Sequence, residues 1–336
     1  MTYDLFYFKK CIQELIAADT IAKEFECGLL LIEKYEALIS MATKPQSLGE
    51  QKETKISGGI ALSPTNALAC LKDPLRTARF IKGVYFGITD LHKEYPHTKL
   101  NILYAGCGPV APLIIPLLHL FSKEKLSIRL LDIHPKSMEI AKNLIQTLNA
   151  SAFFADYIVA DATLYSFPES IPLHCLISET MDKALTIEPQ IEILKNLSHQ
   201  IEPDGIQIPA RIELQMTYSF FSKRAFFKTN QKTAPTTLPV NTAKNHPLFY
   251  VDKSNSNSLS TPYTSAKYER PGEIADVPDI CILTRVVVYQ DIVLEDAQSL
   301  ITNPYCVTNF YTFPQNGFQL EYTIDPYPKW DMKKVN

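Results

Sequence analysis

Short apolar runs alternate with helical segments between residues 99 and 178, and this alternation constrains the fold more than any other feature of the chain. The runs have the length and content of buried strands, and they cover residues 100–105, 127–132, 156–160 and 174–178. The stretches at 111–122 and 135–148 have a helical pattern. Strands separated by helices are typical of βαβ units. They predict a doubly wound, Rossmann-like α/β domain whose parallel sheet is covered on both faces.

The regions before residue 99 and after residue 178 have different residue patterns. Apolar residues recur at helical spacing over 3–42 and again over 65–92, and the polar stretch 43–57 predicts a linker or a mobile loop. Beyond residue 205, runs of β-branched and aromatic residues predict a mostly antiparallel, barrel-like β domain with a long loop over 228–279. We therefore expect three parts: an N-terminal helical region with its linker (1–60), the α/β domain (61–205) and the β-rich domain (206–336).

Composition narrows the class of protein. The formal net charge is −3 and basic residues are scattered, which does not favour nucleic acid as the main partner. The seven cysteines lie far apart, with no CxxC pair and no zinc-ligand spacing, so neither a metal site nor a disulfide framework is indicated. No apolar run reaches membrane-spanning length and the first residues lack a signal-peptide pattern, so we expect a cytoplasmic protein with no membrane partner.

A glycine turn follows the first predicted strand. Gly106 and Gly108 let the backbone bend tightly and approach a ligand, although a GxG pair alone is also common as structural punctuation. The next two strands end in Asp132 and in Asp161-Ala162, where a ribose and an adenine amine would need acceptors. Because no third glycine follows, the site suits a nucleoside without phosphates better than NAD or ATP.

Two glutamates flank the loop after the fourth strand. Glu179 follows the strand and Glu188 lies nine positions later, before an amphipathic helix. The intervening segment is long enough to fold back, so both carboxylates can face one cavity. The alternative is structural: Glu188 caps the helix and Glu179 is a solvated loop acid.

The glycine turn and strand-end acids resemble those of class I methyltransferases, and three further passages resemble the protein arginine methyltransferase family. Ser178-Glu-x-Met181 with Glu188 is similar to the double-glutamate loop, and 201–209 to the passage that leads into the family's β-barrel. Residues 71–80 resemble the family's Asp-x-x-Arg-Thr helix, which implies that Arg76 contacts the cofactor carboxylate; the alternative is a surface ion pair with Asp73.

The resemblance implies S-adenosylmethionine as cofactor. The implied cofactor-binding residues are Arg76, Ala105, Gly106, Gly108, Asp132, Ile133, Asp161, Ala162 and Glu179, and the implied catalytic residues are Glu179, Glu188 and Met181, with Met181 packing near the transferred methyl. The chain departs from the family at Tyr104, where an acidic residue is common, at Asp182, where the family has glycine, and at Pro189. The family's N-terminal aromatic motif and Thr-His-Trp loop have no clear counterpart.

The expected activity is N-methylation of a guanidinium or another cationic nitrogen that the two carboxylates hold. Two alternatives stay open: a small-molecule N- or O-methyltransferase, and a protein that binds S-adenosylmethionine without catalysis. The acceptor is then either an arginine-containing protein or a small amine or guanidine metabolite. The sequence also leaves open a homodimer and the role of residues 1–60.

Overall fold

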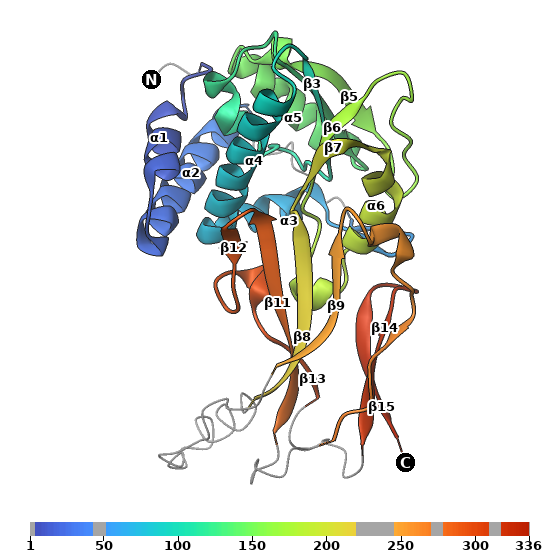
Figure 1. Ribbon diagram of the computed structural model, residues 1–336. Coiled ribbons are helices and arrows are strands. Elements are labelled where there is room, and N and C mark those ends of the chain that lie inside the picture. Colours follow the sequence, from blue (N-terminus) through green and yellow to red (C-terminus); the bar gives the residue numbers. More distant parts are fainter. Residues whose placement is uncertain (1–3, 43–51, 220–244, 270–277, 309–316, 336) are drawn as a thin grey trace.

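The computed structural model describes residues 4–42, 52–219, 245–269, 278–308 and 317–335. A five-stranded parallel sheet forms its upper half in Figure 1, with strand order β5-β4-β3-β6-β7. The strands are β3 (Leu100–Ala105), β4 (Leu126–Asp132), β5 (Phe154–Val159), β6 (Leu173–Ser178) and β7 (Ile201–Ile208). All four pairings are parallel; the alternating apolar runs predict the three pairings among β3, β4, β5 and β6, but not the addition of β7.

Helices cover both sides of this sheet. The longer helices are α1 (Lys9–Ala17), α2 (Ile21–Ala42), α4 (Pro74–Glu94), α5 (Pro135–Thr147) and α6 (Gln190–Leu197). In Figure 1, α4 and α5 lie to the left of β6 and β7, and α6 lies to their right. Helix α2 packs on both α4 and α5, so the N-terminal helices extend the layer on that side. None of the described helices is both long and apolar enough to cross a membrane.

Two predicted helical segments differ from the structure, and proline explains both. The pattern over 65–92 splits into α3 (Pro64–Ala69), a short 3-10 turn (Cys70–Lys72) and α4, because Pro74 disfavours the helical conformation at Asp73. The expected helix over 111–122 is only a 3-10 helix, Ile115–Leu120. Pro112 and Pro116 lack the backbone N–H that an α-helix needs in its interior.

The carboxyl-terminal half is antiparallel β structure, as the sequence predicts. One sheet has the order β12-β11-β8-β9 with β13 added to β11, and a second has the order β10-β14-β15. The strands are β8 (Arg211–Ser219), β9 (His246–Asp252), β10 (Tyr263–Thr264), β11 (Asp279–Tyr289), β12 (Ile292–Leu294), β13 (Tyr305–Thr308), β14 (Phe318–Thr323) and β15 (Lys329–Lys334). Part of the long loop predicted over 228–279 lies outside the described residues. The described part contains β9, which pairs with β8, and β10, so the prediction of one continuous loop is wrong there.

The predicted domain limits fall inside elements. Strand β7 continues through Ile208, so the parallel sheet extends past residue 205. A small antiparallel hairpin, β1 (Thr54–Ile56) with β2 (Gly59–Ala61), crosses the limit at residue 60 and occupies part of the expected linker. We call residues 54–61 the hairpin below.

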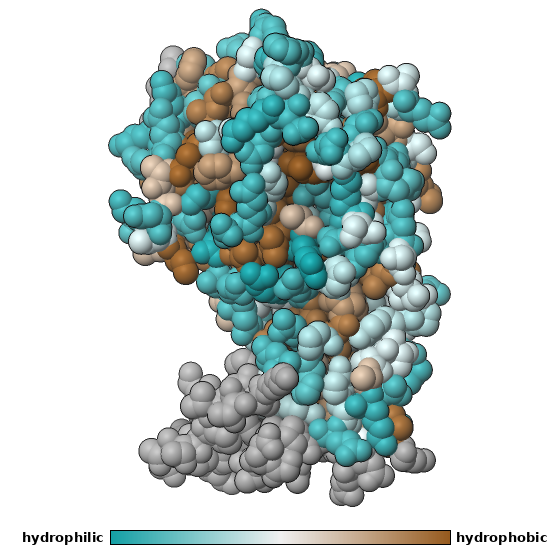
Figure 2. Space-filling view, viewed as in Figure 1, coloured by the Kyte–Doolittle hydropathy of each residue, from teal (hydrophilic) through white to brown (hydrophobic). Residues whose placement is uncertain are grey.

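One continuous core joins the halves. A single cluster of buried apolar side chains includes Phe80 of α4, Ile102 of β3, Met216 of β8 and Trp330 of β15. On the face shown in Figure 2, apolar residues also appear among polar ones over the helical half. Exposed apolar residues of α2 include Ile21, Phe25 and Leu29. The shared core fixes the β domain against the α/β domain, so the β domain can support a site that the α/β domain and the hairpin line.

Candidate active site

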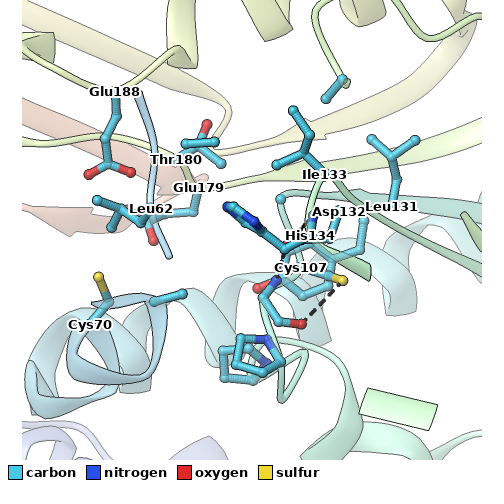
Figure 3. A pocket seen from close by; sticks show the side chains of 18 of the residues that line it. Leu62, Cys70, Cys107, Leu131, Asp132, Ile133, His134, Glu179, Thr180 and Glu188 are labelled. Atoms are coloured by element: carbon cyan, nitrogen blue, oxygen red, sulfur yellow. Dashed lines mark hydrogen bonds between the residues drawn. The ribbon is translucent and has the colours of Figure 1, made fainter. Parts of the chain in front are cut away.

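A cavity lies at the carboxyl ends of β3, β4, β5 and β6, between them and the hairpin, α3 and the start of α4 (Figure 3). Its lining residues include Ile56, Ala61, Leu62, Cys70, Arg76, Gly106, Gly108, Asp132, Ile133, His134, Ala160, Ala162, Glu179, Thr180 and Glu188. Figure 3 shows Glu188 and Cys70 on one side of this cavity and Asp132 and His134 on the other. Parallel strands end at the same edge of a sheet, and ligands of open α/β sheets bind there.

The glycine turn forms one wall. Gly106 has φ +68° and Gly108 φ +61°, a left-handed conformation that suits glycine. The N–H groups of Gly106 and Cys107 donate to the carbonyl of Leu131 at 2.8 and 3.2 Å, which holds the turn against the end of β4. A Cβ on Gly106 would lie 2.2 Å from Cγ2 of Thr180, so the turn is packed tightly against the segment after β6.

Asp132 connects this turn to the next strand end. Its Oδ2 accepts from the N–H of Gly108 at 2.9 Å, and its Oδ1 accepts from the N–H of His134 at 2.8 Å. The residue is 8% exposed, and burial raises the pKa of its carboxyl while the two N–H groups oppose that rise. Each oxygen still has a free lone pair, so the carboxylate can accept two hydroxyl groups from a ligand in the cavity.

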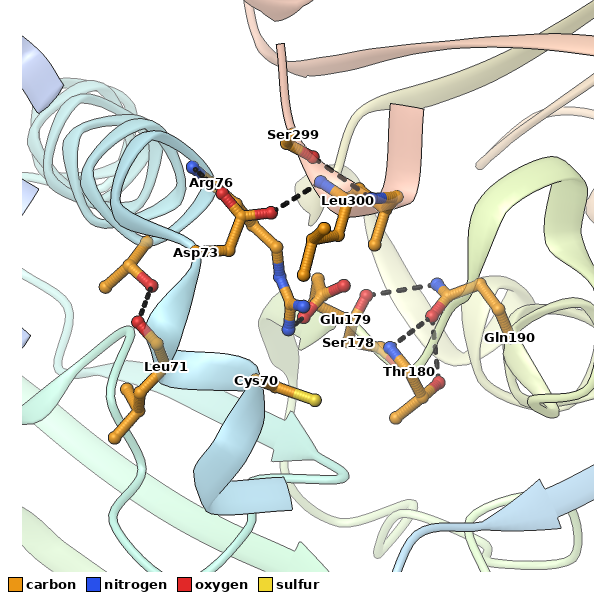
Figure 4. Close-up of polar contacts among 12 residues, drawn as sticks. Cys70, Leu71, Asp73, Arg76, Ser178, Glu179, Thr180, Gln190, Ser299 and Leu300 are labelled. Carbon is orange, nitrogen blue, oxygen red and sulfur yellow. Dashed lines mark hydrogen bonds and ion pairs between the residues drawn. The ribbon is translucent and has the colours of Figure 1, made fainter. Parts of the chain in front are cut away.

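Arg76 and Glu179, which both line the cavity, form a largely buried ion pair (Figure 4). Arg76 Nη2 donates to Glu179 Oε2, and the two side chains are 14% and 4% exposed. Asp73 does not pair with the Arg76 guanidinium; its Oδ1 accepts from the Arg76 N–H and its Oδ2 from the Leu300 N–H, as the N-cap of α4. The alternative prediction, a surface ion pair between Arg76 and Asp73, is therefore wrong.

Glu179 keeps one oxygen free. Its Oε1 is buried and has no hydrogen-bond partner among the described residues. Burial raises the pKa of the Glu179 carboxyl to about 7, although the Arg76 charge lowers it. A buried acceptor without a partner is costly, so this oxygen can gain a hydrogen bond from a donor that enters the cavity.

Glu188 supplies the second carboxylate. Burial, then the nearby charge of Glu179, raises its pKa to about 8. The hairpin lies against this residue, because the N–H of Ile60 donates to the carbonyl of Ile187 at 2.9 Å. The cavity therefore concentrates two carboxyl groups beside one arginine, and a second cation would relieve the excess negative charge.

Gln190 fixes the segment that carries Glu179. This residue is 0% exposed, and its Oε1 accepts from the N–H and the hydroxyl of Thr180 at 2.7 and 2.8 Å. Its Nε2 donates to the carbonyl of Ser178 at 3.0 Å. The start of α6 thus holds the end of β6 in place (Figure 4). Glu179 directly precedes Thr180, and Glu188 lies two residues before Gln190.

The β domain holds the middle of the same loop. Ala184 N donates to Thr284 Oγ1 at 2.9 Å, and Trp330 Nε1 donates to the carbonyl of Ala184 at 3.0 Å. Tyr322 donates its hydroxyl to the carbonyl of Leu185 at 2.7 Å. Ala184, Leu185 and Ile187 have φ values of +55°, +56° and +66°, which non-glycine residues seldom adopt. Long-range hydrogen bonds therefore stabilise the strained loop between the two glutamates.

Comparison with known proteins gives a structural likeness only. No protein-family model matches the sequence, and neither does any curated protein. The structure of PRMT6 with SAH aligns with a TM-score of 0.55 at 10% identity, over 79% of this chain and 97% of that one. A second PRMT6 structure gives 0.54 at 10% identity, over 80% and 99%. Protein arginine methyltransferase 10 of Arabidopsis thaliana gives 0.51 at 13% identity, over 76% and 86%.

The chain has the fold of a protein arginine methyltransferase. The expectation of a Rossmann-like sheet followed by an antiparallel β domain is confirmed, and so is the resemblance to this family. Within that fold, the structure brings most of the predicted site residues to one cavity: Arg76, Gly106, Gly108, Asp132, Ile133, Ala162, Glu179 and Glu188.

Three predicted residues do not line the cavity. Asp161 Oδ1 accepts from the N–H and the hydroxyl of Thr163 at 2.8 and 2.7 Å, so one oxygen of its carboxylate is bonded within its own turn. Ala160 and Ala162 face the cavity instead. Met181 is 2% exposed and belongs to the hydrophobic core, where a flexible apolar side chain is stabilised by burial. Ala105 is fully buried within β3, and the wall there is formed by Tyr104 and Gly106.

Several lining residues have no sequence signal of their own. Cys70 and Thr180 face the cavity although neither is part of a recognisable ligand pattern. His134 also lines it, and its buried Nε2 has no partner among the described residues. Their closeness to Arg76, Glu179 and Asp132 in the sequence is the only feature that could have pointed to them.

Proposed function

We propose that this chain is an S-adenosylmethionine-dependent methyltransferase that methylates a guanidinium or another cationic nitrogen. One observation carries the proposal: Glu179 and Glu188, both with raised pKa values, face the cavity that the glycine turn and Asp132 also line. A structural role for the glutamates would leave them capped or solvated. Instead, Glu179 Oε1 is buried and unpaired among the described residues.

The residues present fit the proposed cofactor. The glycine turn leaves backbone space beside Asp132, whose carboxylate would accept the two ribose hydroxyls. Arg76 would hold the cofactor carboxylate, as the sequence resemblance implies, while it stays close to Glu179. The SAH in one PRMT6 structure supports this assignment by likeness of fold. When bound, S-adenosylmethionine would supply an electrophilic methyl group.

The two glutamates would hold the acceptor. A guanidinium is a poor nucleophile because it is always charged, and two carboxylates can bind it through several charge-assisted hydrogen bonds. Glu179 Oε1 and Glu188 would keep the positive charge on the nitrogens that do not react and would align the one that does. Alignment and exclusion of water could supply several of the ~7–11 kcal/mol attributed to well-oriented reactants. The buried loop, fixed by Gln190 and Trp330, suits that task.

Binding of a cationic acceptor should also change the protonation of the two glutamates. Because the pKa values of Glu179 and Glu188 are raised to about 7 and about 8, one or both carboxyls hold a proton near neutral pH in the free protein. A cation between them favours ionisation, so acceptor binding should release protons and strengthen with rising pH.

A small-molecule acceptor is the second candidate, and the hairpin favours it. Ile56, Ala61 and Leu62 place apolar side chains beside the cavity, and the Ile60–Ile187 hydrogen bond closes the hairpin onto the segment before Glu188. A wall in this position favours a compact amine or free guanidine over a long peptide.

The test compares acceptors and variants with radiolabelled S-adenosylmethionine. We expect transfer to free arginine or to a Gly/Arg-rich peptide, and which of the two is labelled decides between the candidates. Glu188→Gln should retain cofactor binding in calorimetry but lose at least a hundredfold in transfer, while Glu139→Gln, an exposed control on α5, should not change the rate. Binding without transfer to any acceptor would favour the non-catalytic alternative. Unchanged turnover in Glu188→Gln would refute the carboxylate clamp.

A further inference from the structure

Two thiols face each other across a pair of strands, and neither of them lines the cavity. Cys281 of β11 is directly opposite Cys306 of β13, and their Sγ atoms are 3.1 Å apart. Opposed residues of antiparallel strands have Cα atoms about 4.5–5.5 Å apart, which lies inside the range of about 4.4–6.8 Å that a disulfide requires. The ladder has an irregularity between Ile280 and Cys281, but Cys281 and Cys306 are register partners, so the backbone permits a bond between these two sulfurs.

The pair is distinctive among the cysteines. All seven are free thiols, and no two others are in hydrogen-bond contact in the described part of the chain. Cys306 is exposed and Cys281 is buried, so only one thiol of the pair is accessible to a reagent in solution. This asymmetry of an accessible and a protected sulfur is typical of dithiols that undergo exchange.

We propose that Cys281 and Cys306 form a reversible disulfide by exchange with a small-molecule disulfide of the glutathione type. The Cys306 thiolate attacks one sulfur of the oxidised reagent, which breaks its S–S bond and releases one thiolate. Cys281 then loses its proton to solvent and attacks Cys306 Sγ, which forms the internal bond and releases the second thiol. The chain loses two electrons and two protons, and one reagent disulfide becomes two thiols.

The surroundings assign the order of these steps. The contact with Cys281 lowers the pKa of the Cys306 thiol, while the same contact and then burial raise the pKa of Cys281. The exposed sulfur is thus the better first nucleophile, and the buried one resolves the mixed disulfide. The proposal does not depend on the proposed function, since neither cysteine lines the cavity.

The bond would act on a strand that supports the site. Strand β11 also carries Thr284, whose hydroxyl accepts from the N–H of Ala184 in the loop between the two glutamates. A cross-link from β11 to β13 would restrain that support at one end.

The experiment incubates the full chain with mixtures of reduced and oxidised glutathione, quenches with acid, alkylates free thiols and maps tryptic peptides. Arg285 lies between the two cysteines in the sequence, so trypsin places them in separate peptides that only a disulfide can join. We expect a joined peptide pair and the loss of two of the seven alkylatable thiols, both reversed by dithiothreitol.

Variants make the outcome sharper. Cys281→Ser should stop the reaction at a glutathione adduct on Cys306, Cys306→Ser should abolish the joined pair, and Cys70→Ser should leave it unchanged. The proposal is overturned if the wild-type chain keeps both thiols alkylatable in fully oxidised glutathione, or if Cys306 stays a glutathione adduct while Cys281 remains alkylatable. These measurements on the wild-type chain do not require any variant to fold.

Discussion

Replacement of Gly106 by alanine tests how the glycine turn is built. The new Cβ would lie 2.2 Å from Thr180 Cγ2, and the backbone would keep φ +68°. Thr180 cannot easily move away, because Gln190 Oε1 binds both its N–H and its hydroxyl. Two separate costs are therefore expected, one from the backbone conformation and one from the steric overlap.

The conformational cost and the steric cost of Gly106→Ala can be measured separately. A left-handed conformation at alanine costs about 1–2 kcal/mol, and forcing a methyl group into a packed region costs about 1–3 kcal/mol. We expect Gly106→Ala to lower the free energy of unfolding by about 2–5 kcal/mol in total. Thr180→Ser removes Cγ2 and retains the hydroxyl, so adding it to Gly106→Ala should recover the steric part and leave about 1–2 kcal/mol.

Equilibrium urea unfolding of the two single variants, the double variant and the wild type measures both costs as a double-mutant cycle. Gly108→Ala is the matched control: it has φ +61°, but its Cβ would lie 3.7 Å from Ala67 Cβ, so only the conformational cost applies. The reasoning is refuted if Thr180→Ser does not rescue Gly106→Ala, or if Gly108→Ala is equally destabilising. We also expect Gly106→Ala to weaken S-adenosylhomocysteine binding by at least tenfold in calorimetry.

Three further predictions concern charge and hydrogen bonds. Because the pKa values of Glu179 and Glu188 are raised to about 7 and about 8, the folded chain binds protons that the unfolded chain has already lost. The free energy of unfolding should therefore fall as pH rises from about 4.5 to 8. Glu188→Gln should flatten that fall, which urea titrations at several pH values measure. Trp330→Phe leaves the buried Ala184 carbonyl without its donor and should cost about 1–3 kcal/mol in urea unfolding, whereas an unchanged midpoint would remove Trp330 from the support of the loop. Asp132→Asn should weaken S-adenosylhomocysteine binding in calorimetry because an amide has one acceptor oxygen and the carboxylate has two; an identical isotherm would exclude Asp132 from the site.

Local pattern was enough to predict four of the five parallel strands, whereas β7 (Ile201–Ile208) was not among the predicted runs. The apolar run at 100–105 is observed as β3 with the same limits, and the other three parallel runs shift by one or two residues. Such strands are buried on both faces, so they appear as continuous apolar segments. The closeness of Gly106, Asp132 and Glu179 could be predicted from the strand pattern, because parallel strands end at one edge of the sheet and each of these residues stands at the end of a strand.

Features set by distant contacts could not be predicted in this way. The carboxylate at Asp161 also follows a predicted strand, as Asp132 does, yet Thr163 binds one of its oxygens locally and the side chain does not line the cavity. The hairpin is stabilised by the Ile187 carbonyl, which lies more than a hundred residues away, and its own composition resembles a linker. Similarly, nothing in the sequence near Trp330 or Tyr322 indicates that they bond to a loop around Ala184.

The support of that loop explains how the β domain contributes to the site although none of the residues that line the cavity comes from it. Three non-glycine residues with positive φ, at about 1–2 kcal/mol each, place a strained segment between Glu179 and Glu188. Such a segment persists only where its surroundings determine its conformation. Here three buried hydrogen bonds, from Ala184 N–H to Thr284 and from Tyr322 and Trp330 to the loop carbonyls, come from three different strands of the β domain. Since the unpaired loop groups would be costly without these partners, the carboxyl-terminal strands fix the relative position of the two carboxylates.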